Sequence, residues 1–196
     1  MSARRKPGQE RSRAMVSAIL DGCARVLLED GYDRASTNRI AKAAGVSVGS
    51  LYQYFSNKEA VIAALAERHL AEEMQVLAEA LATSKDAPLP ETADAVIRGL
   101  FAAHQVNPAL HAVLVTALPA SLLATVKVRC CEQITEVMNA RRDELRIEDT
   151  ELAAFILVEM VDSSLQAATV ERQEYLADDR LIEALVEVTL RFIQRD

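Results

Sequence analysis

The chain has 196 residues, of which 51% are hydrophobic and 26% are charged. That balance is ordinary for a globular protein and argues against disordered and fibrous classes. No apolar run approaches the roughly 20 residues that a membrane span needs, and the charged start lacks the apolar stretch of a secretory signal. We therefore expect a cytoplasmic location and no membrane partner.

The net charge of −7 conceals a separation of charge along the chain. Residues 1–58 hold ten Lys and Arg against five Asp and Glu, whereas the remaining 138 residues hold twelve against twenty-four. A small basic part followed by an acidic part predicts that the first part meets a polyanion and the second does not. The basic tail before residue 14 is either an arm that reaches a minor groove or a disordered solubility segment.

Apolar residues recur at intervals of three and four in the first part of the chain, which predicts helices rather than strands. The pattern predicts four helices there, over residues 9–30, 38–44, 48–55 and from the capping residue to about 83. Glycines should end the first and second helices, and Ser, Thr or Asn should cap the starts of the second, third and fourth helices. These expected caps and stops are Gly31, Thr37, Gly45, Ser47 and either Ser56 or Asn57.

The clearest break is "SKDAPLP" (residues 84–90), which has two prolines in a polar stretch. Five further helices are predicted after it, over residues 91–105, 108–117, 119–145, 148–172 and 178–194. The expected fold is therefore all-α with about nine helices. We divide it into an N-terminal domain of three helices, residues 1–58, and a C-terminal helical domain, residues 59–196.

Two short helices joined by a turn at Gly45 have the form of a helix-turn-helix. At about 100° per residue, Leu51 and Phe55 share the face that packs inward. Gly49 and Gln53 then point the opposite way. A major groove admits a helix, and the bare backbone of Gly49 allows close approach to base edges. The pattern predicts that the helix over residues 48–55 reads DNA.

The segment "ASTNRIAKAAGVSVGSLYQYFSNKEAVIAAL" resembles very closely the DNA-binding segment of the tetracycline-repressor (TetR) family of bacterial regulators. The resemblance covers about residues 10–65 and rests on "IAKAAGVS", on a small residue before "LYQYF" and on the Lys that follows the turn. It implies phosphate contacts from Thr37, Tyr54 and Lys58. It implies positions at or near base edges for Asn38, Val48, Gly49, Ser50, Tyr52 and Gln53, and Arg39 completes the predicted set. The alternative is surface tyrosines and a solvated lysine.

The last two helices are apolar around more of their circumference than a monomer needs. A surface helix requires one apolar stripe, whereas the final helix has two adjoining ones and its predecessor is similarly apolar. Two such neighbours suggest a four-helix dimer bundle about a two-fold axis, which the resemblance also implies. The predicted interface residues are Leu181, Leu185, Val188 and Phe192. A thick monomer core is the alternative.

Polar residues beside apolar stretches of the C-terminal helices indicate a small-molecule site. The candidate ligand-binding residues are Phe101, His104, His111, Gln133, Met138, Phe155 and Glu159. Buried polar side chains more commonly satisfy caps or neighbouring helices, so this structural reading stays open. Glu159 has three possible partners: a base such as His104 or Arg129, the rim of the dimer, or a cationic ligand.

Three cysteines, Cys23, Cys130 and Cys131, lack a His or Cys at zinc-ligand spacing. We expect reduced thiols, no metal and no cofactor. An enzyme that used Cys130 or Cys131 with His104 or His111 would leave the helix-turn-helix unexplained.

The sequence thus predicts a homodimeric DNA-binding transcriptional regulator and not an enzyme. In its simplest form it is a repressor that a small molecule releases from a double-stranded operator with an inverted repeat. The alternative is a regulator without a small-molecule effector, controlled by a protein partner or by cysteine oxidation.

Overall fold

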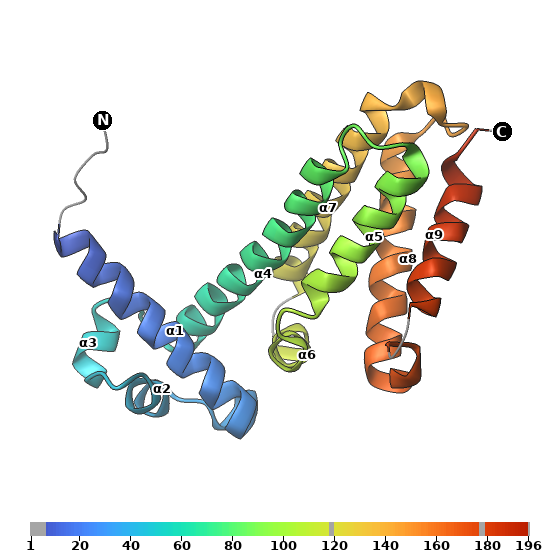
Figure 1. The fold of residues 1–196 in the computed structure, drawn as a ribbon. Helices are drawn as coiled ribbons and strands as arrows, with labels where there is room; N and C mark the ends of the chain where they lie inside the picture. Colours follow the sequence, from blue (N-terminus) through green and yellow to red (C-terminus); the bar gives the residue numbers. More distant parts are fainter. Residues whose placement is uncertain (1–6, 118–119, 177–178, 196) are drawn as a thin grey trace. The chain divides into compact units, whose positions relative to one another are not determined.

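The computed structural model describes residues 7–117, 120–176 and 179–195 (Figure 1). Within these ranges the regular structure is helical, which confirms the predicted all-α class and its nine helices. The α-helices are α1 (Pro7–Arg34), α2 (Thr37–Ala44), α3 (Val48–Tyr52), α4 (Lys58–Thr83), α5 (Leu89–His104), α6 (Pro108–Ala117), α7 (Ala120–Ala140), α8 (Thr150–Glu171) and α9 (Arg180–Ile193). Two short 3-10 turns, Arg142–Glu144 and Gln173–Leu176, follow α7 and α8. Of the predicted basic arm, residues 1–6 lie outside the described residues, and residues 7–13 belong to the start of α1.

The helices form two compact units. The first ends at His69, inside α4, and also includes α6; the second holds the rest of the chain. This division differs from the expected boundary after residue 58. Val61, Ile62 and Leu65 of α4 are fully buried in the first unit, so the start of α4 belongs to the core of that unit.

In the first unit, α1 packs closely against α2. A Cβ added to Gly22 of α1 would lie 2.6 Å from the backbone nitrogen of Ala44, so only glycine permits this approach of α1 to α2. Gly31 has a φ of 75° and produces a kink in α1 rather than its end. The N-cap of α2 is Ser36 rather than the predicted Thr37, because Ser36 is extended and its Oγ accepts a hydrogen bond from the Arg39 N–H.

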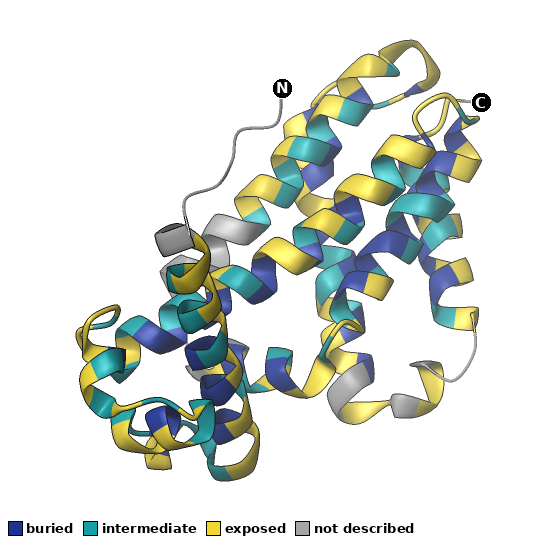
Figure 2. Ribbon diagram, turned by 60° about the vertical axis from the view of Figure 1, so that its left-hand side comes forward, coloured by how far each residue is buried: buried dark blue, intermediate teal, exposed yellow. Residues whose placement is uncertain are grey.

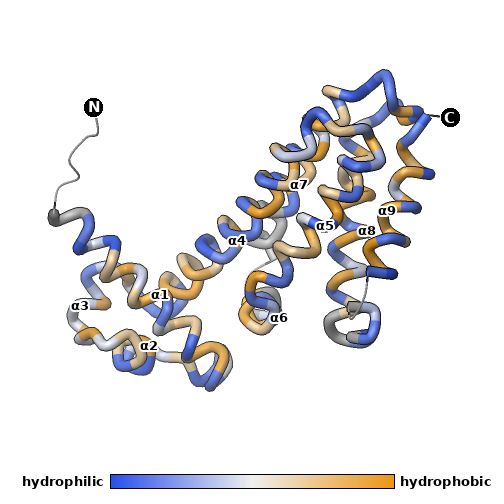
Figure 3. Tube along the Cα trace, viewed as in Figure 1, coloured by the Kyte–Doolittle hydropathy of each residue, from blue (hydrophilic) through white to orange (hydrophobic). Residues whose placement is uncertain are grey.

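In the second unit, α7 packs on α8, and α5 packs on both α8 and α9. Their inward faces share one core that includes Ile97, Leu100, Leu157 and Leu185, and Figure 2 shows buried residues on the facing sides of these helices. Hydrophobic and hydrophilic residues lie on different faces of α9 (Figure 3). No helix in the described part combines the length and the apolar character that crossing a membrane requires.

Candidate DNA-binding surface and ligand cavity

The turn between α2 and α3 sets the direction of α3. Gly45 adopts the left-handed conformation with a φ of 70°, and the next residue, Val46, donates its N–H to the Ala41 carbonyl at 3.0 Å. Ser47 then caps α3 as predicted, because its Oγ accepts the Ser50 N–H at 3.0 Å. A left-handed glycine followed by a serine cap turns the chain within three residues. The local sequence therefore builds a helix-turn-helix.

α3 is anchored on one side and open on the other. Leu51 is fully buried, whereas Tyr52 is 53% exposed and Gly49 and Gln53 are also exposed. A Cβ at Gly49 would meet nothing closer than the Ser47 Oγ at 3.9 Å. Packing within the protein therefore does not require glycine at this position. Its small size leaves the outer face of α3 open to close approach by a partner.

Two predicted DNA contacts from different helices meet at this surface. The Thr37 hydroxyl at the start of α2 lies 3.2 Å from the Tyr52 hydroxyl at the end of α3. Asn38 is exposed beside Thr37, and Tyr54 is exposed beyond Tyr52. Paired hydroxyls at the start of one helix and the end of the next suit phosphate oxygens. Val48 and Ser50, which are partly buried, complete the predicted base-facing helix.

The two predicted cations are both held by α1. Lys58 donates to the Tyr32 carbonyl at 3.3 Å, and its Nζ lies 4.5 Å from the centre of the Tyr32 ring. Arg39 forms an ion pair with Asp30 at 3.0 Å. Because its charge is balanced by a carboxylate, Arg39 is the poorer candidate for a phosphate contact. Lys58 contacts a carbonyl and a ring rather than a carboxylate, so it is the better candidate for a phosphate contact.

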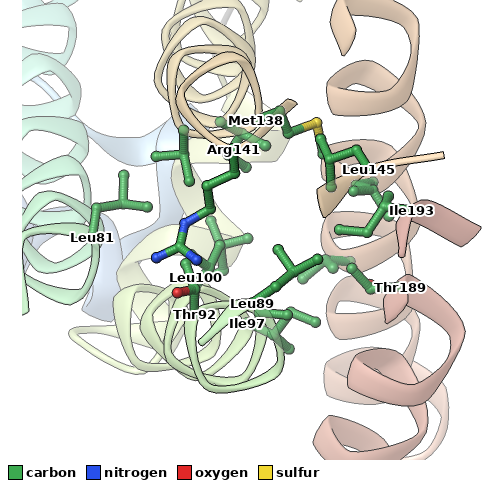
Figure 4. A pocket seen from close by; sticks show the side chains of 16 residues that line it. Leu81, Leu89, Thr92, Ile97, Leu100, Met138, Arg141, Leu145, Thr189 and Ile193 are labelled. Carbon is green, nitrogen blue, oxygen red and sulfur yellow. The ribbon is translucent and has the colours of Figure 1, made fainter. Parts of the chain in front are cut away.

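The second unit contains a cavity lined by side chains from α4, α5, α7, α8 and α9 (Figure 4). Its empty space, counted together with the open solvent at its mouth, is about 580 Å³. Most of the lining is aliphatic, and it includes Leu81, Leu89, Leu100, Met138, Leu145 and Ile193. The polar lining residues are Thr92, Arg141 and Thr189. This is the apolar character that small-molecule sites generally have.

Two of the three polar lining residues bind the turn between α4 and α5. The Thr92 hydroxyl donates to the Ser84 carbonyl at 3.1 Å, and the Arg141 guanidinium donates to the carbonyls of Lys85 at 2.8 Å and Ala87 at 2.6 Å. Thr189 differs, because its buried hydroxyl has no hydrogen-bond partner among the described residues. An unpaired buried hydroxyl costs about 1 to 3 kcal/mol. A bound molecule with one hydrogen-bonding group would remove that cost.

The structure brings only one of the seven predicted ligand-binding residues, Met138, to this cavity. Phe155 is 54% exposed, and His111 belongs to the first unit. Phe101 and Gln133 are half-buried but do not line the cavity. Sequence reasoning missed Thr92, Arg141 and Thr189. Thr189 was detectable, because it follows Leu185 and precedes Ile193 by one turn each on the apolar stripe of α9.

The other two predicted ligand residues, His104 and Glu159, belong to a charged cluster. The His104 Nε2 lies 3.1 Å from the Asp162 carboxylate, and Lys127 contacts Asp162 at 2.8 Å and Glu159 at 2.9 Å. Burial opposes the charged form of Asp162, but hydrogen bonds from His104 and Lys127 outweigh it and lower its pKa to about 2. Burial likewise opposes protonation of His104, yet the hydrogen bond to Asp162 leaves its pKa raised. Glu159 thus pairs with Lys127 rather than with His104 or Arg129.

The thiols of Cys23, which is buried, and Cys130, which is half-buried, are poor nucleophiles. Burial raises the pKa of Cys130 to about 11 and that of Cys23 to about 12, so both are protonated at neutral pH. The Cys130 thiol donates to the Met74 sulfur at 3.3 Å, and the His104 ring is engaged with Asp162 and the Leu100 carbonyl. The Cys130 thiol and the His104 ring therefore have other partners and are not paired with each other, as one form of the enzyme alternative requires.

The predicted dimer stripe on α9 is divided between the core and the surface. Leu185 is buried in the core of its own unit, and Leu181 and Phe192 pack against that core. Val188 is 50% exposed. The exposed apolar side chains of α8 are Leu152, Phe155 and Ile156. Exposed apolar side chains are therefore present on both helices. Leu185 is not among them, because it is buried in the core of its own chain.

Comparisons with known proteins extend over both units. Residues 19–65 match the family described as "Bacterial regulatory proteins, tetR family". Residues 88–192 match the "Tetracyclin repressor-like, C-terminal domain". The fatty acid metabolism regulator protein of Bacillus subtilis is 31% identical over 80 residues, which are 39% of this chain and 41% of that protein. The nucleoid occlusion factor SlmA of Actinobacillus pleuropneumoniae is 55% identical over 40 residues, 20% of each chain. The chain thus spans less than half the length of these curated relatives.

Solved structures share the fold over nearly the whole chain. The fatty acid degradation regulator FadR from Bacillus halodurans has a TM-score of 0.71 at 22% identity, and the match covers 96% of this chain and 97% of the FadR chain. The complex of SmeT with triclosan has a TM-score of 0.73 at 23% identity and covers 93% of each chain. SmeT is the repressor of a multidrug efflux pump of Stenotrophomonas maltophilia. Since the C-terminal match alone covers more than half of the 196 residues, the chain belongs to the tetR family of bacterial regulatory proteins.

Proposed function

We propose that this protein is a homodimeric transcriptional repressor that binds a double-stranded operator through α3 and is released by an apolar small molecule. The observation that carries the proposal is the open face of α3. Gly49 and Gln53 are exposed there although the helix is fixed by the fully buried Leu51. Such a helix is rigid enough to present side chains and bare enough to enter a major groove. Binding to chromosomal DNA implies a cytoplasmic location.

Base contacts come from the outer face of α3, and phosphate contacts come from its surroundings. Gln53 is the side chain best suited to recognise a base edge, since a carboxamide can donate and accept together. Thr37, Tyr54 and Lys58 hold phosphates on either side. Tyr52 is fixed by its contact with Thr37, so it positions one of these groups as well as meeting the DNA.

The dimer forms through the exposed apolar side chains of α8 and α9. Phe155, Ile156 and Val188 are accessible in the single chain, and large exposed apolar side chains on neighbouring helices are typical of protein interfaces. A two-fold axis through this face presents two copies of α3 to one duplex. The operator is accordingly an inverted repeat.

The effector is an uncharged or weakly polar molecule that enters the cavity of the second unit. Thr92 and Arg141 already donate hydrogen bonds to backbone carbonyls of the turn between α4 and α5. Thr189 is therefore the residue that can form a hydrogen bond with one polar group of the ligand. Triclosan, bound in the SmeT complex, and the fatty acids in the name of the Bacillus halodurans regulator are both largely apolar. The cavity here suits that class of molecule.

Effector binding reaches the DNA through α4. This helix carries Lys58 at its start and Leu81 in the lining of the cavity. A ligand that displaces Leu81 shifts α4 and therefore the phosphate contact at its start. Reciprocal coupling of this kind is typically about 1 to 3 kcal/mol. Control by cysteine oxidation is the weaker alternative, because burial keeps the Cys130 thiol protonated.

Selection of DNA from a random duplex pool tests the function. The full chain should enrich an inverted repeat whose half-site centres lie about one helical turn, or a multiple of it, apart. The enriched site should bind about 10³-fold or more tightly than a scrambled duplex at physiological salt. Enrichment of no sequence, or equal affinity for the scrambled duplex, would contradict the proposal. Enrichment of a single site without a repeat would agree with DNA binding but would contradict the proposed dimer.

A further inference from the structure

The last part of α1 contains a backbone conformation that is essentially confined to glycine. Gly31 has a φ of 75° and a ψ of 171°, a combination that other residues almost never adopt. A Cβ at this position would meet no atom within 4 Å, so crowding by neighbours does not explain the glycine. The backbone conformation is therefore what requires glycine here. Its consequence is a kink that redirects the chain immediately before Tyr32.

Beyond the kink, Tyr32 presents two groups to the start of α4. Its backbone carbonyl accepts a hydrogen bond from the Lys58 Nζ at 3.3 Å, and the same Nζ lies 4.5 Å from the centre of its ring. The carbonyl also accepts the Ala35 N–H at 3.2 Å, so both of its lone pairs are used. Tyr32 and Lys58 are each half-buried, and both belong to the first unit. Lys58 is therefore held from two directions by one residue.

These contacts restrain a side chain that is otherwise flexible and unfavourably placed. A lysine has a four-carbon stem with many rotamers, and ordering that stem on binding costs conformational entropy. Lys58 is also the first residue of α4, where the helix dipole disfavours a cation unless negative charge is near. The negative face of the ring and the carbonyl oxygen offset that repulsion. Because an ammonium group has three N–H donors, at least one stays available for a phosphate oxygen.

We propose that Tyr32 is a positioning residue for DNA binding, and that its ring and carbonyl hold Lys58 in the orientation from which Lys58 contacts a phosphate. This inference rests on the proposed function, in which Lys58 is a phosphate contact. Since a restrained lysine loses less freedom when it binds, Tyr32 raises the affinity for DNA without adding a contact of its own. The gain is the same for every sequence, because phosphates carry no base information.

A double-mutant cycle with Tyr32→Leu and Lys58→Ala, in the full chain and on both the selected operator and random duplex DNA, tests this role. Tyr32→Leu removes the ring and keeps the backbone carbonyl, so both duplexes should bind about two- to fivefold more weakly, the size of an exposed cation–π contact. The salt slope should not change, because the charge is retained. In the Lys58→Ala background, Tyr32→Leu should have no further effect. Tyr32→Phe is the matched control, because it keeps the ring face, and it should bind as the unaltered chain does.

The dependence on Lys58 separates positioning from a general effect on the fold. A loss of the same size when Tyr32→Leu is made in the Lys58→Ala background would overturn the proposal, because Tyr32 would then act through the fold or directly on DNA. Unchanged binding by Tyr32→Leu would also overturn it, and so would tighter binding, since Tyr32 would then hold Lys58 away from DNA. In each of these results Lys58→Ala still weakens binding, and the phosphate contact of the proposed function survives. Only unchanged binding by Lys58→Ala itself would remove both.

Discussion

Replacing Phe155 and Val188 together with Glu should convert the protein to monomers and remove specific operator binding. Both side chains are about half exposed in the single chain and lie on the two helices of the proposed interface. A carboxylate buried without a partner costs several kcal/mol, and a symmetric dimer would meet each carboxylate twice. A single copy of α3 then reads one half-site, and affinity should fall about 10³-fold towards the non-specific level. Sedimentation equilibrium and operator titration measure the two effects.

Val106→Glu provides the matched control for this double variant. Val106 is also an exposed apolar residue, but it lies in the connection between α5 and α6. It should leave both the dimer and operator affinity unchanged. Leu185→Glu is unsuitable, because Leu185 is buried in the core of its own chain and its replacement would unfold the second unit. A dimer that persists with Glu at both 155 and 188 would place the interface elsewhere.

Replacing Ala93 with Phe should abolish the response to effector while operator binding persists. Ala93 is buried on α5 and lines the cavity, so a phenyl ring at this position occupies the space that a ligand needs. Triclosan and a long-chain fatty acid are suitable apolar probes. Where either probe raises the melting temperature of the unaltered chain and weakens operator binding, Ala93→Phe should lose both effects. Differential scanning fluorimetry and operator titration with and without probe are the measurements.

Ala102→Phe is the control for cavity filling. Ala102 lies on the same helix but is exposed. It adds the same ring without entering the cavity, so the response to the probe should remain. Overpacking at Ala93 costs about 1 to 3 kcal/mol, which a melting curve without probe will register separately. A full probe response from a folded Ala93→Phe chain would show that the effector binds outside this cavity.

The helices could be predicted closely because their signals are local. Gly45 and Ser47 define the turn before α3 by conformational preference and capping, and Pro108 marks the first residue of α6 as the sequence indicates. The predicted cap of α2, Thr37, was wrong by one residue, because Ser36 and Thr37 are adjacent and both can accept the hydrogen bond. The extended backbone of Ser36 selects it. Such choices depend on where the chain enters the helix rather than on residue type.

The cavity and the ring contact between His69 and His111 could not be predicted because they depend on tertiary packing. His69 and His111 are far apart in the sequence, and their proximity follows from the position of α6 in the first unit. The pairing of Glu159 with Lys127 likewise joins α8 to α7, which no spacing rule relates. Leu185 illustrates the opposite difficulty. Its apolar stripe was visible in the sequence, but whether a stripe faces its own core or a partner is decided by the neighbouring helices.

The central claim is that α3 reads base edges while its surroundings hold phosphates. Titration of the selected operator and of random duplex DNA with Gln53→Ala and Lys58→Ala, over a range of salt concentrations, tests it most directly. Gln53→Ala should lose about 1 to 3 kcal/mol at one position of the operator and leave random DNA unaffected. Lys58→Ala should weaken binding to both duplexes and reduce the slope of log K against log salt by about one. Equal losses by Gln53→Ala on operator and random DNA would contradict the account.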